Sequence, residues 1–122
     1  MAKQVMAIDD SATVRQVLRM TLENEGYEII EAENGRHALE VFPDSGVDMV
    51  VTDLNMPEMD GIELIREVRQ KPGARFMPII MLTTESQPEK KAEGKKAGAS
   101  GWITKPFKPE QLLAVVRMVC PA

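Results

Sequence analysis

The 122 residues are enough for one domain with its own hydrophobic core. Hydrophobic residues make up 43% of the chain and charged residues 28%, which excludes an intrinsically disordered protein. The net charge of −4 argues against a protein that binds nucleic acid by neutralising phosphates. A single cysteine, Cys120, excludes an internal disulfide, and no apolar run approaches the length of a membrane span. Because no signal-peptide pattern precedes the first apolar run, we expect a cytoplasmic protein.

Five short apolar runs predict β-strands, and most of them lack a polar face, which is typical of strands buried on both sides. They lie at residues 5–8, 27–30, 49–52, 79–82 and 101–104. The second run has flanking acids, so we expect it near an edge of the sheet.

Apolar residues at helical spacing follow each of the five runs. The stripes that predict four helices are Val14, Val17, Leu18 and Leu22; Ala38, Leu39 and Phe42; Leu64, Ile65 and Val68; and Leu112, Val115, Val116 and Val119. The remaining segment, residues 89–97, offers only Ala92 and Ala97 as apolar anchors and contains Gly94. Because packing rather than propensity stabilises most helices, we expect this helix to be the least stable.

Strands that alternate with helices predict an α/β fold, with a parallel sheet between two layers of helices. Right-handed crossovers leave two common arrangements, the flavodoxin-like strand order 2-1-3-4-5 and a fragment of a Rossmann sheet. The sequence shows no internal repeat or linker, so we expect a single domain over residues 1–122.

Polar residues follow four of the five predicted strands. They are Asp9 and Asp10 after the first, Asp53 after the third, Thr83 and Thr84 after the fourth, and Lys105 and Pro106 after the fifth. Ligands of open parallel sheets bind beyond the carboxyl ends of the strands, where the strand order reverses. We therefore expect three carboxylates, two hydroxyls and one ammonium group in the same crevice.

Three crowded carboxylates repel one another unless a proton or a cation neutralises them. Oxygen ligands of this kind suit Mg²⁺ or Mn²⁺, and Mg²⁺ takes only one or two protein carboxylates. Lys105 offers a positive charge to a phosphate oxygen, and a threonine hydroxyl can donate to another. The pattern predicts a binding site for a phosphoryl group, with Asp53 at the end of the central strand as the candidate nucleophile.

Each of these residues also has an ordinary explanation when it is taken alone. The pair Asp9-Asp10 is a common helix cap, Asp53 suits a turn, and Lys105 suits a solvated surface. These explanations give no reason for polar groups to coincide at one edge of the sheet, so the joint pattern favours a functional site.

Four motifs in order carry a family resemblance: Asp9-Asp10, the segment TDLNMPEMDG at residues 52–61, Thr83, and Lys105-Pro106-Phe107. With these motifs the whole chain resembles the receiver domain of two-component response regulators, and within that family the stand-alone chemotaxis regulators of the CheY type. The resemblance implies a flavodoxin-like three-layer sandwich of five strands in the order 2-1-3-4-5 with five helices. It also implies that Asp53 accepts a phosphoryl group from the phosphohistidine of a CheA-like sensor histidine kinase.

The resemblance further implies a role for each matching residue of the site. Asp10 and Asp53 would bind Mg²⁺ together with the main-chain carbonyl of Asn55, and Asp9 would act mostly through water. Lys105 would contact the acyl phosphate, and Pro106 would follow a cis peptide bond, which proline tolerates best.

The same resemblance implies a switch beside the acceptor. Thr83, next to the second hydroxyl of Thr84, would turn toward the phosphoryl group. Trp102 occupies the aromatic switch position and would turn inward, although it is equally well explained as a half-buried residue of the last strand. Asn55 and Glu85 occupy positions that tune the rate of dephosphorylation in this family, where a polar side chain can orient a water.

We expect the output face to comprise the weak helix, the last strand and the last helix. Lys90, Lys91, Lys95 and Lys96 would make this face basic and suited to an acidic partner, or they form a solvated lysine face. If the chain acts in chemotaxis, its partners would include a flagellar motor switch protein and a phosphatase. We expect a monomer that binds neither nucleic acid nor membrane and is no enzyme beyond its own phosphoryl transfer and dephosphorylation.

Three other functions compete with a chemotaxis switch. A receiver could also serve as a phosphorelay intermediate or a phosphate sink. A Mg²⁺-dependent phosphohydrolase resembling the haloacid dehalogenase family needs a general acid where this chain has Asn55. A flavodoxin-like electron carrier needs a phosphate-binding loop after the first strand, where Asp9 and Asp10 would repel the cofactor.

Overall fold

Five parallel strands form one sheet in the order β2-β1-β3-β4-β5 in the computed structural model, which describes residues 2–122. The strands are β1 (Gln4–Ile8), β2 (Glu28–Ala32), β3 (Met49–Thr52), β4 (Ile79–Thr83) and β5 (Gly101–Thr104). This order confirms the flavodoxin-like prediction and excludes a Rossmann fragment. The strand with flanking acids, β2, lies at an edge of the sheet, as expected.

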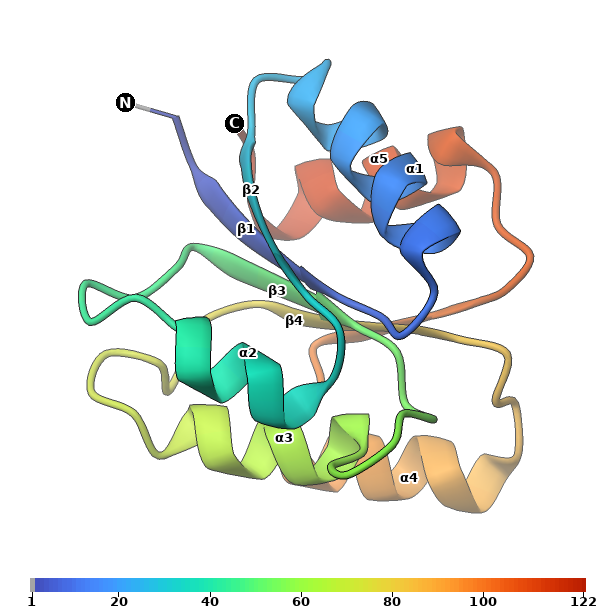
Figure 1. The fold of residues 1–122 in the computed structure, drawn as a ribbon. Helices are drawn as coiled ribbons and strands as arrows, with labels where there is room; N and C mark the ends of the chain where they lie inside the picture. The colour runs from blue at the N-terminus through green and yellow to red at the C-terminus, as the bar shows by residue number, and fades with distance from the viewer. Residues whose placement is uncertain (1) are drawn as a thin grey trace.

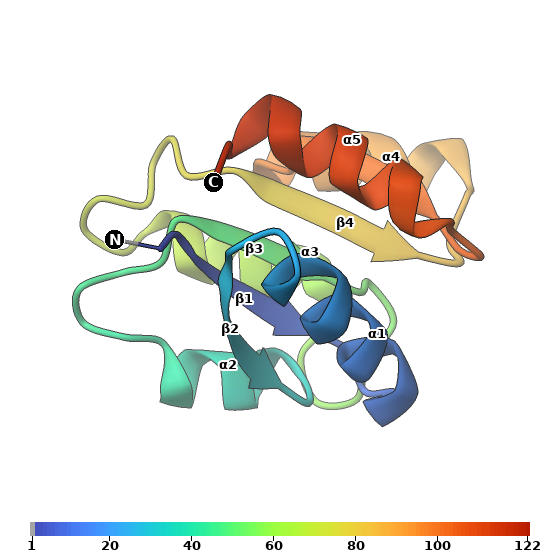
Figure 2. The ribbon, with the colours of Figure 1, turned by 90° about the horizontal axis from the view of Figure 1, so that it is seen from above.

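Helices cover both faces of the sheet and give the molecule three layers (Figures 1 and 2). One face carries α1 (Ala12–Glu23) and α5 (Pro109–Val119), and the other carries α2 (Gly35–Val41), α3 (Gly61–Arg69) and α4 (Pro88–Ala97). The predicted three-layer α/β fold is therefore confirmed. Within residues 2–122, no helix is both long and apolar enough to cross a membrane.

The hydrophobic core has two halves because side chains alternate between the faces along each strand. In β1, Val5 and Ala7 pack in the half formed with α1 and α5, whereas Met6 and Ile8 pack in the half formed with α2 and α3. All four of these side chains are almost fully buried. The central strands are therefore held from both sides, and the ends of these strands make a fixed platform for the loops that follow.

The register of the two central strands explains where the polar residues go. Ile8 at the end of β1 lies opposite Thr52 at the end of β3, so the two strands end side by side. The next residues, Asp9 and Asp53, therefore leave the sheet as neighbours. Strands β4 and β5 also end in register, which brings their loops to the same edge.

Two predictions about helix packing are wrong in detail. In α1, Leu18 and Leu22 are buried, but Val17 is 39% exposed and does not belong to the core. In α4, Ala92 is exposed, and the one buried residue is Gly94. The apolar stripe of α1 is therefore narrower than expected, and α4 packs through Gly94 and the partly buried Ala97 rather than through Ala92.

Candidate functional site

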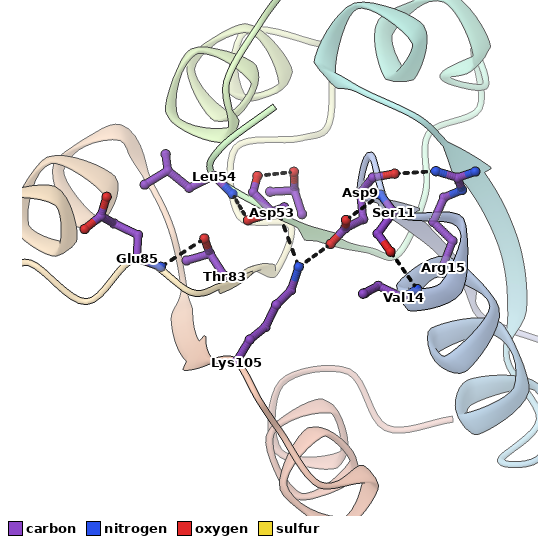
Figure 3. Close-up of polar contacts among 10 residues, drawn as sticks. Asp9, Ser11, Val14, Arg15, Asp53, Leu54, Thr83, Glu85 and Lys105 are labelled. Carbon is purple, nitrogen blue, oxygen red and sulfur yellow. Dashed lines mark hydrogen bonds and ion pairs between the residues drawn. The ribbon is translucent and has the colours of Figure 1, made fainter. Parts of the chain in front are cut away.

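The carboxyl ends of β1, β3 and β5 bring an acidic cluster and a lysine together, as Figure 3 shows for all of them except Asp10. Asp9, Asp10 and Asp53 each offer a carboxylate oxygen, and these oxygens lie within 4.8 Å of one another. The Lys105 Nζ lies 2.7 Å from Asp9 Oδ2 and 3.2 Å from Asp53 Oδ2. Residues that are far apart in the chain thus share one site at the end of the sheet where the strand order reverses.

The loop between β1 and α1 presents two acids in different surroundings. Asp9 is only 1% exposed, and its Oδ1 accepts the main-chain N–H of Ser11 at 2.9 Å. Ser11 in turn is the N-cap of α1, and its hydroxyl accepts the N–H of Val14 at 3.3 Å. Asp10 is exposed, so its carboxylate faces solvent beside the buried carboxylate of Asp9.

Asp53 is held in a tight loop between β3 and α3. Its side-chain Oδ1 accepts the N–H of Leu54 at 2.7 Å, and its carbonyl accepts the Thr52 hydroxyl at 2.9 Å. The loop closes where the N–H of Gly61 donates to the Leu54 carbonyl at 2.8 Å. A Cβ at Gly61 would lie 2.3 Å from the Asp53 carbonyl oxygen, so only glycine fits there.

Gly61 is therefore a site residue that the sequence analysis missed. It carries no side-chain chemistry, and its importance depends on how closely α3 approaches the acceptor strand. The available signal was its place at the end of the 52–61 segment that carries the family resemblance.

The three acidic side chains of the site outnumber its one lysine, so a proton or a further cation must offset the remaining negative charge. Burial raises the pKa of the Asp9 carboxyl, and the hydrogen bonds from Lys105 and Ser11 only partly oppose this effect. For Lys105, burial by itself would lower the pKa, but Asp9 and Asp53 together raise it, which keeps the ammonium charged. Three carboxylates against one ammonium leave an excess of negative charge.

This donor set fits a hard divalent cation such as Mg²⁺. Carboxylate oxygens are the ligands that Mg²⁺ prefers, and a divalent charge would offset the excess negative charge. Asp10 and Asp53 are the carboxylates expected to hold the ion, with Asp9 beside them. Asn55 is exposed in the loop that follows Asp53, where its carbonyl is the expected main-chain ligand.

Thr83 ends β4 and Thr84 follows it, and the two threonines differ in their surroundings. Thr83 is fully buried, and its Oγ1 accepts the main-chain N–H of Glu85 at 3.3 Å. Thr84 is exposed and lines a surface hollow together with Lys105, Pro106 and Phe107. The peptide bond between Lys105 and Pro106 is cis.

Trp102 connects β5 to the loop and helix that follow β4. Its indole N–H donates to the Glu85 carbonyl at 3.0 Å, so the loop that Thr83 touches is also tied to Trp102. The ring lies against α4, where a Cβ on Gly94 would be 2.8 Å from the Trp102 Cζ3 atom. The glycine in the middle of α4 therefore makes room for the indole.

Two lysines of α4 line a second hollow on the surface. Lys91 and Lys95 line it together with Ala99, Ser100, Gly101 and Trp102. Lys91, Lys95 and Lys96 are exposed. The Lys90 Nζ lies 3.9 Å from Glu93 Oε2 on the same helix, which is within ion-pair distance. The hollow therefore combines an aromatic wall with a lysine rim.

Comparisons with known proteins agree with this geometry. The family model of the response regulator receiver domain matches residues 5–117. The chain is 40% identical over 114 residues to the transcriptional regulatory protein ResD of Bacillus subtilis, a match that covers 93% of this chain and 46% of ResD. It is 38% identical over 117 residues to the phosphate regulon transcriptional regulatory protein PhoB of Pseudomonas aeruginosa, covering 96% of this chain and 51% of PhoB. The chain thus spans about half the length of these relatives.

Solved structures match over nearly the full length of both chains. The chemotaxis protein CheY4 of Vibrio cholerae superposes with a TM-score of 0.92 at 45% identity, covering 98% of this chain and 99% of that chain. A putative response regulator from Chloroflexus aurantiacus superposes with a TM-score of 0.90 at 33% identity, covering 98% of each chain.

Proposed function

The chain belongs to the response regulator receiver domain family, and from this membership we propose that it is a phosphorylation-dependent switch with Asp53 as its acceptor. The observation that supports this function best is the cluster of three carboxylates within 4.8 Å, with Lys105 paired to two of them. The family implies a histidine kinase as phosphodonor. In this proposal the chain works in the cytoplasm as a monomer and catalyses only its own phosphoryl transfer and dephosphorylation.

The transfer step uses the Asp53 carboxylate as the nucleophile. One of its oxygens attacks the phosphorus of the donor phosphohistidine, a P–O bond forms, and the P–N bond breaks with its electron pair left on the imidazole nitrogen. The Lys105 ammonium, 3.2 Å from Asp53 Oδ2, lies where it can contact oxygens of the transferred group. Mg²⁺ held by Asp10 and Asp53, with Asp9 and the Asn55 carbonyl, would neutralise negative charge around the phosphoryl group.

The new charge reaches the surface through the loop after β4. Phosphorylation adds nearly one negative charge and three strong acceptor oxygens at Asp53. The Thr83 hydroxyl, whose oxygen accepts the Glu85 N–H, can turn to donate its proton to one of these oxygens. Because the Glu85 carbonyl accepts a hydrogen bond from the Trp102 indole, a shift of this loop also displaces the indole ring, which packs against Gly94 of α4. The proposed output is a changed face formed by α4, β5 and α5.

Within this function we propose chemotaxis signalling, with a CheA-like kinase and a flagellar motor switch protein as partners and a phosphatase that resets the signal. The support is the match to chemotaxis protein CheY4, which covers 99% of that chain. In such a short-lived signal, the polar side chains of Asn55 and Glu85 beside the acceptor would tune dephosphorylation.

A phosphorelay or transcriptional role is the second candidate. The observation in its favour is the match to relatives named as transcriptional regulatory proteins, of which the chain spans about half. Binding of the phosphorylated chain to the motor switch protein of the same organism would favour chemotaxis. Phosphoryl transfer onward to a histidine protein would favour the phosphorelay.

The decisive experiment for the acceptor is chemical phosphorylation. With Mg²⁺ and acetyl phosphate, intact-mass spectrometry should show one added phosphoryl group in the wild-type chain. Asp53→Asn should abolish this addition because the amide is not a nucleophile. Asp44→Asn, at an exposed acid in the loop after α2, is the matched control and should be labelled like the wild type. Labelling that persists in Asp53→Asn, or that needs no metal, would contradict the proposal.

A further inference from the structure

Arg15 lies beside the acidic cluster, and the proposed function gives it no role. Its side chain is 14% exposed although it belongs to the first turns of α1. Its Nη1 donates to the main-chain carbonyl of Asp9 at 2.5 Å, and its Nε donates to Glu31 Oε1 at 3.1 Å (Figure 3 shows the first contact). The guanidinium therefore contacts the main chain of a site residue rather than a site carboxylate.

Asp10 depends on that main chain for its position. Among residues 2–122, no hydrogen bond or ion pair fixes the Asp10 carboxylate. Its place next to Asp9 and Asp53 is therefore set by the main chain on either side of it. On one side the Asp9 N–H donates to the Ala32 carbonyl of β2 at 3.2 Å, and the Asp9 carbonyl accepts a hydrogen bond from Arg15 Nη1. On the other side the Ser11 N–H is held by the Asp9 carboxylate.

Glu31 in turn holds the Arg15 guanidinium in place. Its Oε1 accepts a hydrogen bond from Arg15 Nε, and its Oε2 accepts one from Arg19 Nε at 2.6 Å. The hydrogen bond and charge of Arg19, followed by those of Arg15, lower the pKa of the Glu31 carboxyl, so the acid stays ionised at neutral pH. Arg15 is thus a bridge between an edge strand and the carbonyl that precedes Asp10.

We propose that Arg15 is the positioning residue of the metal site: its guanidinium fixes the Asp9 carbonyl and thereby orients the exposed Asp10 carboxylate toward the ion. This inference rests on the proposed function, because it assumes that Asp10 binds Mg²⁺. Arg15 contacts neither the ion nor the phosphoryl group in this account. It acts on affinity through the geometry of the Asp9–Ser11 loop, as residues outside the ligand set of metal sites do.

The direction of the change in Mg²⁺ affinity distinguishes a positioning role of Arg15 from a purely electrostatic one. A guanidinium near a cation site repels the cation, so removing its charge without moving the loop would tighten Mg²⁺ binding. Loss of the loop anchor would weaken Mg²⁺ binding. A weaker affinity after neutral substitution at this position is therefore a result that charge removal alone cannot produce.

The test is calorimetric titration of the unphosphorylated chain with MgCl₂ at constant ionic strength. Arg15→Gln should raise the Kd for Mg²⁺ about tenfold, the lower end of the range for residues that orient metal ligands. Arg15→Lys keeps the charge but loses the planar fork that spans two acceptors, so its Kd should lie between those of Arg15→Gln and the wild type. If Arg15→Gln does not fold, as judged by circular dichroism, the Arg15→Lys chain decides the test by the same criterion.

Arg19→Gln is the matched control. It removes a guanidinium that binds the same Glu31 but makes no contact with Asp9, so its Kd should stay within about twofold of the wild type. Unchanged or tighter Mg²⁺ binding in the Arg15 variants, or an equal loss in Arg19→Gln, would overturn the inference. Absence of Mg²⁺ binding in the wild-type chain would overturn the proposed function together with it, so the two failures are distinguishable.

Discussion

Helices α3 and α4 lie side by side on the same face of the sheet, yet they are held in very different ways (Figure 1). Helix α3 begins with a capping box between Asp60 and Glu63 and buries five of its residues, whereas α4 has no side-chain cap bond at Gln87 and buries only Gly94. The helix that positions Asp53 is thus fixed by packing and capping. The neighbouring helix on the proposed output face is attached lightly, so a modest free energy can move it.

The largest expected effect comes from the glycine that begins α3. In Gly61→Ala the new Cβ would lie 2.3 Å from the Asp53 carbonyl oxygen, a main-chain atom that cannot move without displacing the acceptor loop. We expect a loss of about 3 kcal/mol or more in the free energy of unfolding, measured by urea denaturation. Phosphorylation by acetyl phosphate should fall as well, because the loop carries Asp53.

Gly94→Ala in α4 is the matched variant. Its Cβ would meet the Trp102 Cζ3 atom at 2.8 Å, which belongs to a side chain that can turn away. The gain in helix propensity, about 1 kcal/mol, opposes the cost of moving the indole, so the net change in stability should be small. The fluorescence of Trp102 should change instead. A loss in Gly94→Ala as large as in Gly61→Ala would show that α4 is as rigidly held as α3.

A second prediction concerns the hydrogen bonds by which Arg69 links the two helices. Arg69 at the end of α3 donates through Nη2 to the Gly98 carbonyl at the end of α4 at 2.6 Å, and through Nη1 to the Ala74 carbonyl at 2.8 Å and the Met77 carbonyl. Arg69→Met would leave these partly buried carbonyls without their donor, which should lower the free energy of unfolding by about 2 kcal/mol. Hydrogen exchange should then speed up at the C-terminal end of α4.

Arg66→Met on the exposed side of α3 is the control for this prediction and should change stability by less than about 0.5 kcal/mol. Equal effects of the two substitutions would mean that Arg69 does not anchor α4. Unchanged exchange at residues 95–98 in Arg69→Met would lead to the same conclusion.

The same contrast explains how far the sequence could predict this protein. The helix-covered parallel sheet follows from the alternation of strands and helices, and the convergence of Asp9, Asp53 and Lys105 follows from their positions at strand ends, because parallel strands deliver their next residues to one edge. The strand order itself was left open between two arrangements by these patterns and was specified only by the family resemblance. The packing of α4 did not follow from the sequence pattern. Ala92, expected to be an apolar anchor, is exposed, whereas Gly94 is buried against the Trp102 ring. That contact joins residues from different elements, and local periodicity carries no information about it.

Gly61 and Arg15 were missed for a related reason. Gly61 has no side chain to mark it, and Arg15 looks like an ordinary helix-surface arginine until its contact with the Asp9 carbonyl is seen. Sequence patterns identify groups that carry the chemistry more readily than groups that hold the main chain in place. Residues that support the site are therefore recognised by their contacts in three dimensions.

The smallest expected effect tests the weak start of α4 directly. Gln87 is the N-cap of this helix and makes no side-chain cap bond, whereas serine at this position can accept a main-chain N–H of the first turn. Gln87→Ser should raise the free energy of unfolding by about 0.5–1 kcal/mol and slow hydrogen exchange at residues 89–91. Gln70→Ser at the C-cap of α3, where the free main-chain groups are carbonyls, is the control and should show no such gain. If Gln87→Ser leaves exchange unchanged, the first turn of α4 is not limited by its missing cap, and its freedom must come from the scarcity of buried side chains alone.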